Sequence, residues 1–351
     1  MSRKFIINKE VITEKSPCYF VAELGANHCG NMKLAKDLID MCKLAGASAV
    51  KLQKRSNKNL FTKKMYNSIY DNRNSYGPTY GKHREFLELT ISQFKQLKKY
   101  AAKKKMLLVC TAFDEESLLE LESINIQVYK IASADITNLP LISRVAATRK
   151  PTFMSTGGSS LKDVELAYRT FTKVHNNLCI MQCTSIYPPK YDQLNLNVIN
   201  LYKKKFKNNI IGLSSHESGI AMDVVAYVMG ARVIEKHVTL NRAMKGTDQA
   251  FSLELIGLKK SIEYLTNAKK AFGSNFKKIL QDEKPLLRKQ IKSIIASRNL
   301  EINQVITLKD VCFKVNGGDG LNPTFLNKFL GKKIRKKVFK DEPLDLKYIK
   351  N

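Results

Sequence analysis

The chain has 351 residues, of which 44% are apolar, enough for one large hydrophobic core and a small further domain. Its formal net charge of +29 would suit a nucleic-acid ligand, but the lysines are scattered over helix-like segments without interleaved aromatic residues, so we expect a solvated surface and no nucleic-acid partner. No apolar run approaches the ~18 residues of a membrane helix, and the seven cysteines form no CxxC pair, so we expect a cytoplasmic protein with neither a membrane segment nor a disulfide.

Short apolar runs alternate along the chain with segments of helical periodicity. We expect eight strands, at residues 18–22, 49–52, 106–110, 127–131, 152–155, 178–182, 210–213 and 233–236. Amphipathic helices are expected between them at 32–45, 92–104, 161–173, 196–206 and 221–229, with N-caps at Asn31, Ser92 and Ser160. Strands that are nearly continuous in apolar character are typical of a parallel sheet buried on both faces. Eight such βα units predict an α/β fold, the (β/α)8 TIM barrel.

The composition changes after the last predicted helix of the barrel, at 252–272. Residues 273–292 are rich in charge, which indicates a linker. Two short strand-like pieces, 294–297 and 311–315, follow with a glycine-rich turn. We therefore predict a barrel domain over 1–272, a linker over 273–292 and a second domain over 293–351, small enough that it should lean on the barrel or on another subunit.

Two histidines follow the last two predicted strands. His216 and His237 lie 21 residues apart, a spacing that excludes one helix face but fits a strand, a helix and the next strand. Because the carboxyl ends of barrel strands meet at one rim, we expect both rings there, forming a metal site with open coordination positions. Mn²⁺ or Mg²⁺ would suit substrate and water oxygens, with Zn²⁺ as an alternative. The alternative without a metal is that both are core histidines whose ring nitrogens are hydrogen-bonded.

Polar residues end every predicted strand. They are Glu23, Lys51, Gln53, Thr111, Lys130, Ser133, Ser155, Gln182, Thr184, His216 and His237. Two lysines that point into one mouth would repel each other unless an anion lies between them, so we infer a small substrate that carries a carboxylate or phosphate. Residues 155–159 suit an oxyanion but are also typical of an ordinary turn. Glu217 and Glu235 adjoin the histidines, and alternation along a strand would turn them away from the cavity.

At these positions the chain resembles the sialic acid synthase family, which condenses phosphoenolpyruvate with an N-acylated hexosamine to make nonulosonic acids. The resemblance spans almost the entire chain. The matching segments are AELGANHCG (22–30), VKLQ (50–53), YKIAS (129–133), STG (155–157), QCTSIYP (182–188), SHESG (215–219), EKH (235–237), KGTD (245–248) and SLE (252–254).

The resemblance implies a barrel followed by an antifreeze-like (SAF, β-clip type) domain that covers the active site of the partner in a domain-exchanged homodimer. It implies that His216 and His237 hold Mn²⁺ or Mg²⁺, which orients the open-chain sugar aldehyde, and that Glu23 handles protons or orients water. The residues expected to hold phosphoenolpyruvate are Lys51, Thr111, Lys130, Ser133, Ser155, Ser185 and Ser214. Those expected to contact the sugar are Gln53, Tyr187, Asp135 and Asp248.

The chain departs from many bacterial members at 314–317, where Lys-Val-Asn-Gly replaces a Lys-Arg-Pro-Gly motif whose arginine reaches the acyl group of the sugar. In this respect it is more like the animal-type branch, whose sugar is the 6-phosphate. Arg73, Lys82 and Arg84 would neutralise such a phosphate, or form only a solvated loop face. Two other functions stay open: a related synthase for another 2-keto-3-deoxy sugar acid (legionaminic, pseudaminic or deaminated), and a non-catalytic carbohydrate-binding barrel.

Overall fold

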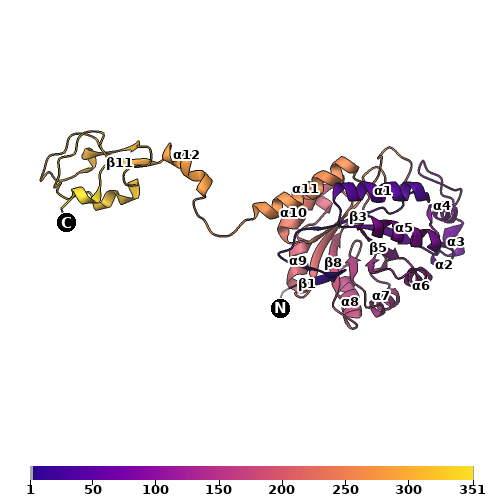
Figure 1. Ribbon diagram of the computed structural model, residues 1–351. Helices are drawn as coiled ribbons and strands as arrows, with labels where there is room; N and C mark the ends of the chain where they lie inside the picture. The colour runs from indigo at the N-terminus through magenta and orange to yellow at the C-terminus, as the bar shows by residue number, and fades with distance from the viewer. Residues whose placement is uncertain (1–2, 351) are drawn as a thin grey trace. The chain divides into compact units, whose positions relative to one another are not determined.

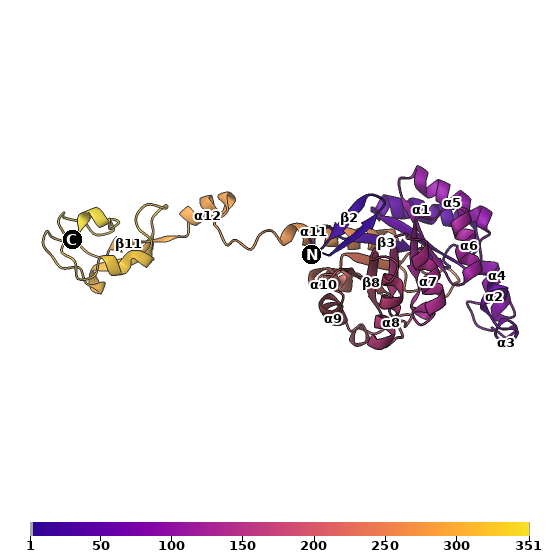
Figure 2. The ribbon, with the colours of Figure 1, turned by 90° about the horizontal axis from the view of Figure 1, so that it is seen from below.

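The computed structural model describes residues 3–350, and the chain divides into two compact units, Met1–Gly273 and Ser274–Asn351. In the first unit, parallel strands close into a barrel in the order β10-β3-β4-β5-β6-β7-β8-β9, with helices packed around it (Figures 1 and 2). The strands are β3 (Tyr19–Glu23), β4 (Ala49–Lys54), β5 (Leu107–Ala112), β6 (Val128–Ile131), β7 (Thr152–Ser155), β8 (Leu178–Cys183), β9 (Ile210–Ser215) and β10 (Val233–His237). Each overlaps a predicted strand, and the predicted (β/α)8 barrel is confirmed.

The helices that follow the strands form the outer layer. They are α1 (Met32–Ala45), α5 (Ile91–Lys103), α6 (Glu115–Ser123), α7 (Leu139–Ala147), α8 (Leu161–Thr172), α9 (Val198–Lys205), α10 (Ala221–Met229) and α11 (Leu255–Ala271). Between β4 and α5 the chain inserts three short helices, α2 (Asn57–Leu60), α3 (Lys63–Tyr66) and α4 (Tyr80–Leu87). This insertion was expected only as a long loop.

Two of the three predicted helix caps are confirmed. The Asn31 side chain accepts hydrogen bonds from Lys33 N and Leu34 N, and Ser160 forms a capping box with Asp163. The prediction of Ser92 was wrong, because Thr90 caps α5 in a capping box and leaves Ser92 inside the first turn. The predicted start of α11 at Ser252 was also wrong. Ser252 lies before the helix, where its hydroxyl accepts a hydrogen bond from the Asn27 side chain and donates one to the Asp248 carbonyl oxygen.

The barrel interior is built in layers, because alternate residues of each strand point inward. The lower layer is apolar and includes Val21, Ala49, Val109, Phe153 and Val233, all completely buried. Two residues further along each of these strands the inward residues become polar: Glu23, Lys51, Thr111, Ser155 and Glu235. The same alternation that buries the lower layer therefore supplies the polar lining above it.

A hairpin closes the amino-terminal end of the barrel. Strands β1 (Lys4–Ile7) and β2 (Glu10–Thr13) pair antiparallel, and Phe5, Ile7 and Ile12 belong to the same apolar cluster as the lower interior layer. The Phe5 ring centroid lies 5.1 Å from that of Phe153. With this end filled by apolar side chains, the carboxyl end of the strands is left for a ligand.

The second unit is small. It contains α12 (Lys284–Arg288) and two antiparallel strands, β11 (Lys292–Ala296) and β12 (Val311–Val315), over a core of its own that includes Ile294, Leu300 and Phe329. Helix α12 lies in the segment predicted as a linker, and β11 begins at Lys292, the last residue of that segment. Among residues 3–350, no helix has both the length and the apolar character needed to cross a membrane.

Candidate active site

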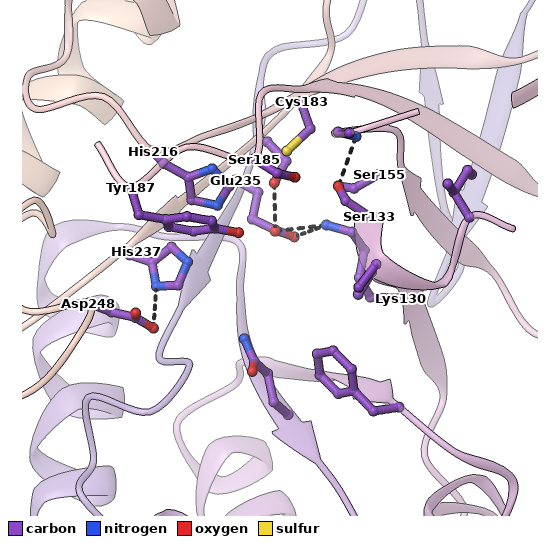
Figure 3. Close-up of a pocket in the computed structure, with 18 of the residues that line it drawn as sticks. Lys130, Ser133, Ser155, Cys183, Ser185, Tyr187, His216, Glu235, His237 and Asp248 are labelled. Carbon is purple, nitrogen blue, oxygen red and sulfur yellow. Dashed lines mark hydrogen bonds and ion pairs between the residues drawn. The ribbon is translucent and has the colours of Figure 1, made fainter. Parts of the chain in front are cut away.

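A cavity of about 620 Å³ lies at the carboxyl ends of the barrel strands. Eleven of the fourteen predicted site residues line it: Lys51, Gln53, Lys130, Ser133, Ser155, Ser185, Tyr187, Ser214, His216, His237 and Asp248. In Figure 3, His216, Tyr187, His237 and Asp248 lie on one side of the pocket, and Lys130, Ser133 and Ser155 lie on the other. The structure thus brings the histidine side and the lysine side of the predicted site into one cavity.

The pocket floor holds a buried network of alternating charges. The Lys130 ammonium lies 2.7 Å from both carboxylate oxygens of Glu235, and the Lys51 ammonium lies 3.0 Å from Glu235 and 3.1 Å from Glu23. Although burial alone would act in the opposite direction, Lys130 and Lys51 hold the pKa of Glu235 well below its usual range. Likewise, burial disfavours the Lys51 cation, but Glu23 and Glu235 raise its pKa. The Lys51 ammonium therefore stays charged, whereas burial, which Glu235 offsets only in part, lowers the pKa of Lys130.

This network corrects two expectations. Glu235 points into the cavity, because it lies two residues before His237 on β10 and shares its face; only Glu217 turns away, to pair with Lys236. Moreover, the anion between the two lysines is Glu235 itself, so their closeness by itself requires no anionic ligand. Each ammonium still has three N–H donors and directs two of them at carboxylate oxygens, which leaves one for a substrate.

Serine hydroxyls from four strand ends gather beside Lys130. Ser214 donates to Glu235 at 3.0 Å, and Ser133 accepts a hydrogen bond from Gly157 N at 2.9 Å. A β-carbon at position 157 would lie 2.2 Å from the Ser185 hydroxyl and 3.0 Å from that of Ser133. Glycine is needed here because the turn passes directly under these hydroxyls.

The two histidines meet at the other wall, with ring centroids 5.3 Å apart. The Tyr187 ring packs on His216 at 4.1 Å, and Asp248 Oδ2 lies 3.6 Å from His237 Nδ1. Burial, and then the neighbouring His237, lower the pKa of His216 to about 3, so this ring is neutral at physiological pH. Gly25 makes room for this wall, since a β-carbon there would lie 3.2 Å from both Glu23 and His237.

These rings fit the donor set of a transition metal or Mg²⁺ site with open positions. His216 Nδ1 lies 3.1 Å from the Thr184 carbonyl oxygen; donation there leaves the Nε2 lone pair for a metal. His237 Nδ1 is buried without a hydrogen-bond partner. Across residues 3–350, His, Cys, Asp and Glu side chains form no group of three that could hold an ion, so substrate or water oxygens would have to complete the coordination.

Three predicted residues do not line the cavity. Glu23 is completely buried behind it, accepting a hydrogen bond from Gln53 at 2.5 Å. The Thr111 hydroxyl is buried without a partner. Asp135 lies in a short 3₁₀ helix, Ser133–Asp135, where it accepts a hydrogen bond from Asn138 at 3.3 Å.

Among the charged lining residues, sequence reasoning missed Arg55 and Glu235. The missed signal is the two-residue period of a strand, which continues from Lys51 through Gln53 to Arg55 and from Val233 through Glu235 to His237. Of the three basic residues considered for a sugar phosphate, Arg84 lines the cavity, Arg73 is exposed, and Lys82 pairs with Glu85.

The barrel and its rim of charged, hydroxyl and imidazole groups define a (β/α)8-barrel enzyme whose site is built for a small polar substrate. The model of the NeuB family matches residues 38–277. N-acetylneuraminate-9-phosphate synthase from Homo sapiens is 33% identical over 328 residues, which cover 93% of this chain and 91% of the relative. N,N'-diacetyllegionaminic acid synthase from Campylobacter jejuni is 31% identical over 326 residues, covering 92% and 97%.

Among solved structures, the N-acetylneuraminic acid synthetase of Leptospira borgpetersenii in complex with citrate has a TM-score of 0.71 at 28% identity, covering 82% of this chain and 96% of that one. The chain belongs to the NeuB family, the sialic acid synthases, and is an enzyme of the transferase type. The predicted family is therefore confirmed.

Proposed function

We propose that the protein is a nonulosonic acid synthase that condenses phosphoenolpyruvate with N-acetylmannosamine, a related N-acyl hexosamine or its 6-phosphate. The observation that carries the proposal is the composition of one cavity: a pair of histidines on one wall faces lysines and serine hydroxyls on the other. The names of the relatives agree with this substrate class, since they are sialic and legionaminic acid synthases.

In the proposed reaction, C3 of phosphoenolpyruvate bonds to the aldehyde carbon of the sugar, water adds at C2, and the bond from C2 to the phosphate oxygen breaks. The products are a nine-carbon 2-keto-3-deoxy acid and inorganic phosphate. The spare N–H donors of Lys51 and Lys130, with the hydroxyls of the floor, bind the carboxylate and phosphate. Their positions are set by Glu235, so the donors are oriented before the substrate arrives.

The opposite wall binds the sugar. Gln53 presents its amide beside Glu23, and Asp248 and Tyr187 flank the histidines, where sugar hydroxyls would find donors and acceptors. Glu23 is the buried carboxylate nearest to this wall, and we assign it the proton that the attacking water gives up. Held between Gln53 and Lys51, it would receive that proton through a hydrogen-bonded neighbour.

We further propose that His216 and His237 hold a divalent metal, Mn²⁺ or Mg²⁺. When bound, such an ion supplies Lewis-acid polarisation of an aldehyde oxygen. The resemblance also predicts that the second unit is an antifreeze-like domain and that the protein is a homodimer. The molar mass in solution tests the latter.

Phosphate release tests the function. Phosphoenolpyruvate, Mn²⁺ and a panel of N-acyl hexosamines should release inorganic phosphate with one of the sugars, together with an equal amount of 2-keto-3-deoxy acid. Lys130→Met, which removes one donor from the floor, should lower kcat/KM for phosphoenolpyruvate. Silence of the wild type across the panel would count against catalysis, and phosphate release without the sugar acid would indicate simple hydrolysis.

A further inference from the structure

A buried lysine lies directly behind the two histidines. Lys236 precedes His237 on β10, and because successive side chains of a strand point to opposite faces, the His237 ring lines the cavity while Lys236 faces the helix layer. In the same way Glu217 follows His216, which begins the loop after β9, and turns away from the cavity. Lys236 and Glu217 meet behind the rings at 2.8 Å, and neither is more than 2% exposed.

The Lys236 ammonium organises the loop that carries His216. It donates to the Glu217 carbonyl oxygen at 3.0 Å, to the Gly219 carbonyl oxygen at 2.8 Å and to the Glu217 carboxylate at 2.8 Å. Because an ammonium has three N–H donors, this one short loop engages all of them. Gly219 has a φ of +120°, in the region that favours glycine, where the loop turns around the ammonium.

Further contacts fix the lysine and the glutamate in place. The Ser215 hydroxyl donates to the Glu217 carboxylate, and Ser215 is the residue of β9 in register with Lys236. From the helix layer, Asp223 Oδ1 on α10 lies 3.7 Å from the ammonium. Asp223 Oδ2 accepts a hydrogen bond from Ser261 on α11 at 2.6 Å. The buried charges are thus tied to both strands and to the two helices that follow them.

The loop that carries His216 is held from two sides. His237 belongs to the strand ladder, whereas His216 lies just beyond β9, where the ladder no longer determines its position. On the cavity side, the His216 ring contacts the Thr184 carbonyl oxygen and the Tyr187 ring. On the opposite side, Lys236 binds the backbone of the loop. Between these contacts the two imidazole centroids lie 5.3 Å apart.

Stability alone does not account for a buried ion pair of this kind. Taking both charges out of water offsets most of their attraction, and replacement of such a pair by apolar residues is often neutral. Removing one partner is costly, because a buried charge is left without its counter-ion. The contacts of Lys236 with two carbonyl oxygens of one loop indicate that its main effect is on the conformation of that loop.

We propose that Lys236 and Glu217 are positioning residues, which hold the loop after β9 against β10 and so set the separation and orientation of the His216 and His237 rings. They touch no ligand in the cavity and act through the two rings. The consequence for a divalent metal rests on the proposed function, whereas the effect on the rings does not. Groups behind ligating histidines typically contribute about 10- to 100-fold to metal affinity.

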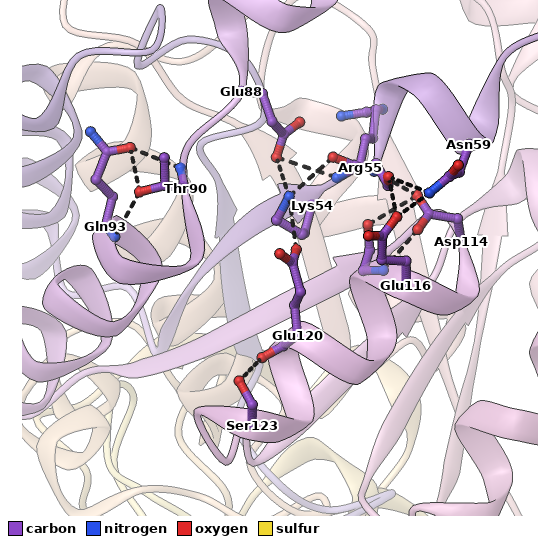
Figure 4. Close-up of polar contacts among 12 residues, drawn as sticks. Lys54, Arg55, Asn59, Glu88, Thr90, Gln93, Asp114, Glu116, Glu120 and Ser123 are labelled. Atoms are coloured by element: carbon purple, nitrogen blue, oxygen red, sulfur yellow. Dashed lines mark hydrogen bonds and ion pairs between the residues drawn. The ribbon is translucent and has the colours of Figure 1, made fainter.

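The chain offers a matched control behind β4 (Figure 4). Lys54 is also a buried lysine at the carboxyl end of a strand, on the side away from the cavity. Its ammonium donates to the Arg55 carbonyl oxygen at 3.1 Å and pairs with Glu88 at 3.4 Å and Glu120 at 3.1 Å. Lys54→Met therefore removes a buried ammonium with the same kinds of partner, and β3 separates its strand from β10.

NMR of the histidine rings tests the proposal without a metal. The chain has five histidines, so the ring signals of ¹⁵N-histidine-labelled protein can be assigned by single substitutions. Lys236→Met should shift the His216 and His237 signals, and Lys54→Met should leave both in place. Lys236→Arg, which keeps the charge and its donors, should lie closer to wild type than Lys236→Met.

A double variant guards against misfolding. Lys236→Met with Glu217→Gln removes both charges together, so it should fold more stably than Lys236→Met, which leaves one buried charge unpaired. It should shift the same two ring signals, because the carbonyl oxygens of the loop still lose their donor. Unchanged His216 and His237 signals in both variants that lack Lys236 would overturn the proposal.

Calorimetric titration of the substrate-free protein with Mn²⁺ measures the consequence. Both variants that lack Lys236 should bind Mn²⁺ about 10- to 100-fold more weakly. Lys54→Met should stay within about twofold of wild type, as expected of a distant site. An equal loss in Lys54→Met and Lys236→Met would overturn the proposal in favour of a general loosening of the barrel.

These measurements keep the inference separate from the proposed function, since neither involves turnover. If wild type binds no Mn²⁺ but the ring signals shift as expected, the metal site fails and the positioning role stands. If no sugar is converted but both measurements follow the expected pattern, the synthase proposal fails and the positioning role again stands.

Discussion

Lys130 Nζ lies 2.7 Å from both carboxylate oxygens of Glu235, in the interior of the barrel. Since Lys51 shares the same carboxylate, the protein carries its own counter-ion between two cations that line the cavity. A substrate anion then meets oriented donors in a nearly neutral floor rather than two bare charges. In the proposed reaction, the departing phosphate would leave behind a floor whose charged groups are already paired with one another.

Glu235→Gln should destabilise the barrel by about 3 kcal/mol, because it leaves two buried ammoniums with one carboxylate fewer. Chemical denaturation measures the loss. Phosphoenolpyruvate should raise the Tm of the variant more than that of wild type, since a ligand carboxylate or phosphate replaces the missing anion. Glu122→Gln, which breaks the surface pair with Lys150, is the control and should cost less than about 1 kcal/mol. Equal costs for the two substitutions would contradict the burial argument.

Gly157→Ala should raise the KM for phosphoenolpyruvate by about tenfold, the size of one weakened hydrogen bond to a charged group. The added β-carbon would meet the Ser185 hydroxyl at 2.2 Å and push it out of the pocket floor. Steady-state kinetics with saturating sugar measure the change. Gly257→Ala on α11 is the control, as its β-carbon finds its nearest neighbour at 3.5 Å. A normal KM in Gly157→Ala would show that the floor hydroxyls do not contact this substrate.

Asp135 should make the protein less stable as the pH rises from 4 to 6. Burial raises its pKa to about 6, above its ordinary value of 3.8, so the folded state holds the proton more tightly than the unfolded chain. The stability it contributes is complete below the unfolded pKa and is lost as the pH rises through 6; the total is about 3 kcal/mol. Asp135→Asn should therefore gain stability relative to wild type between these pH values in urea denaturation. A constant difference across the range would contradict the assignment.

His216→Ala and His237→Ala should abolish metal-dependent turnover. Each removes one of two ring nitrogens, and Mn²⁺ affinity should fall by at least about 100-fold in calorimetry, independently of any activity. His175→Ala is the control, because its ring packs on Phe171 away from the cavity and should leave Mn²⁺ binding unchanged. Full activity of either pocket variant in metal-stripped buffer would refute the metal site.

The strands of the barrel and most of its site could be predicted from the sequence. Apolar runs such as 178–182 are local, and the polar residue that ends each run must lie at the carboxyl rim once the strands are parallel. This position at the strand ends was enough to predict that His216 and His237 lie close together. Ser92 was misassigned as a cap for an equally local reason, since Thr90 also precedes the helix and satisfies the capping box.

Only the tertiary structure decided which charges meet. Closure of the barrel pairs β10 with β3 and sets His237 opposite Glu23, and it brings Glu235 between two lysines from β4 and β6. Packing of the insertion brings Arg84 to the rim beside Arg55. Strand periodicity determines the face that a side chain occupies, whereas its neighbours across the cavity depend on register, closure and loop packing, which join segments far apart in the chain.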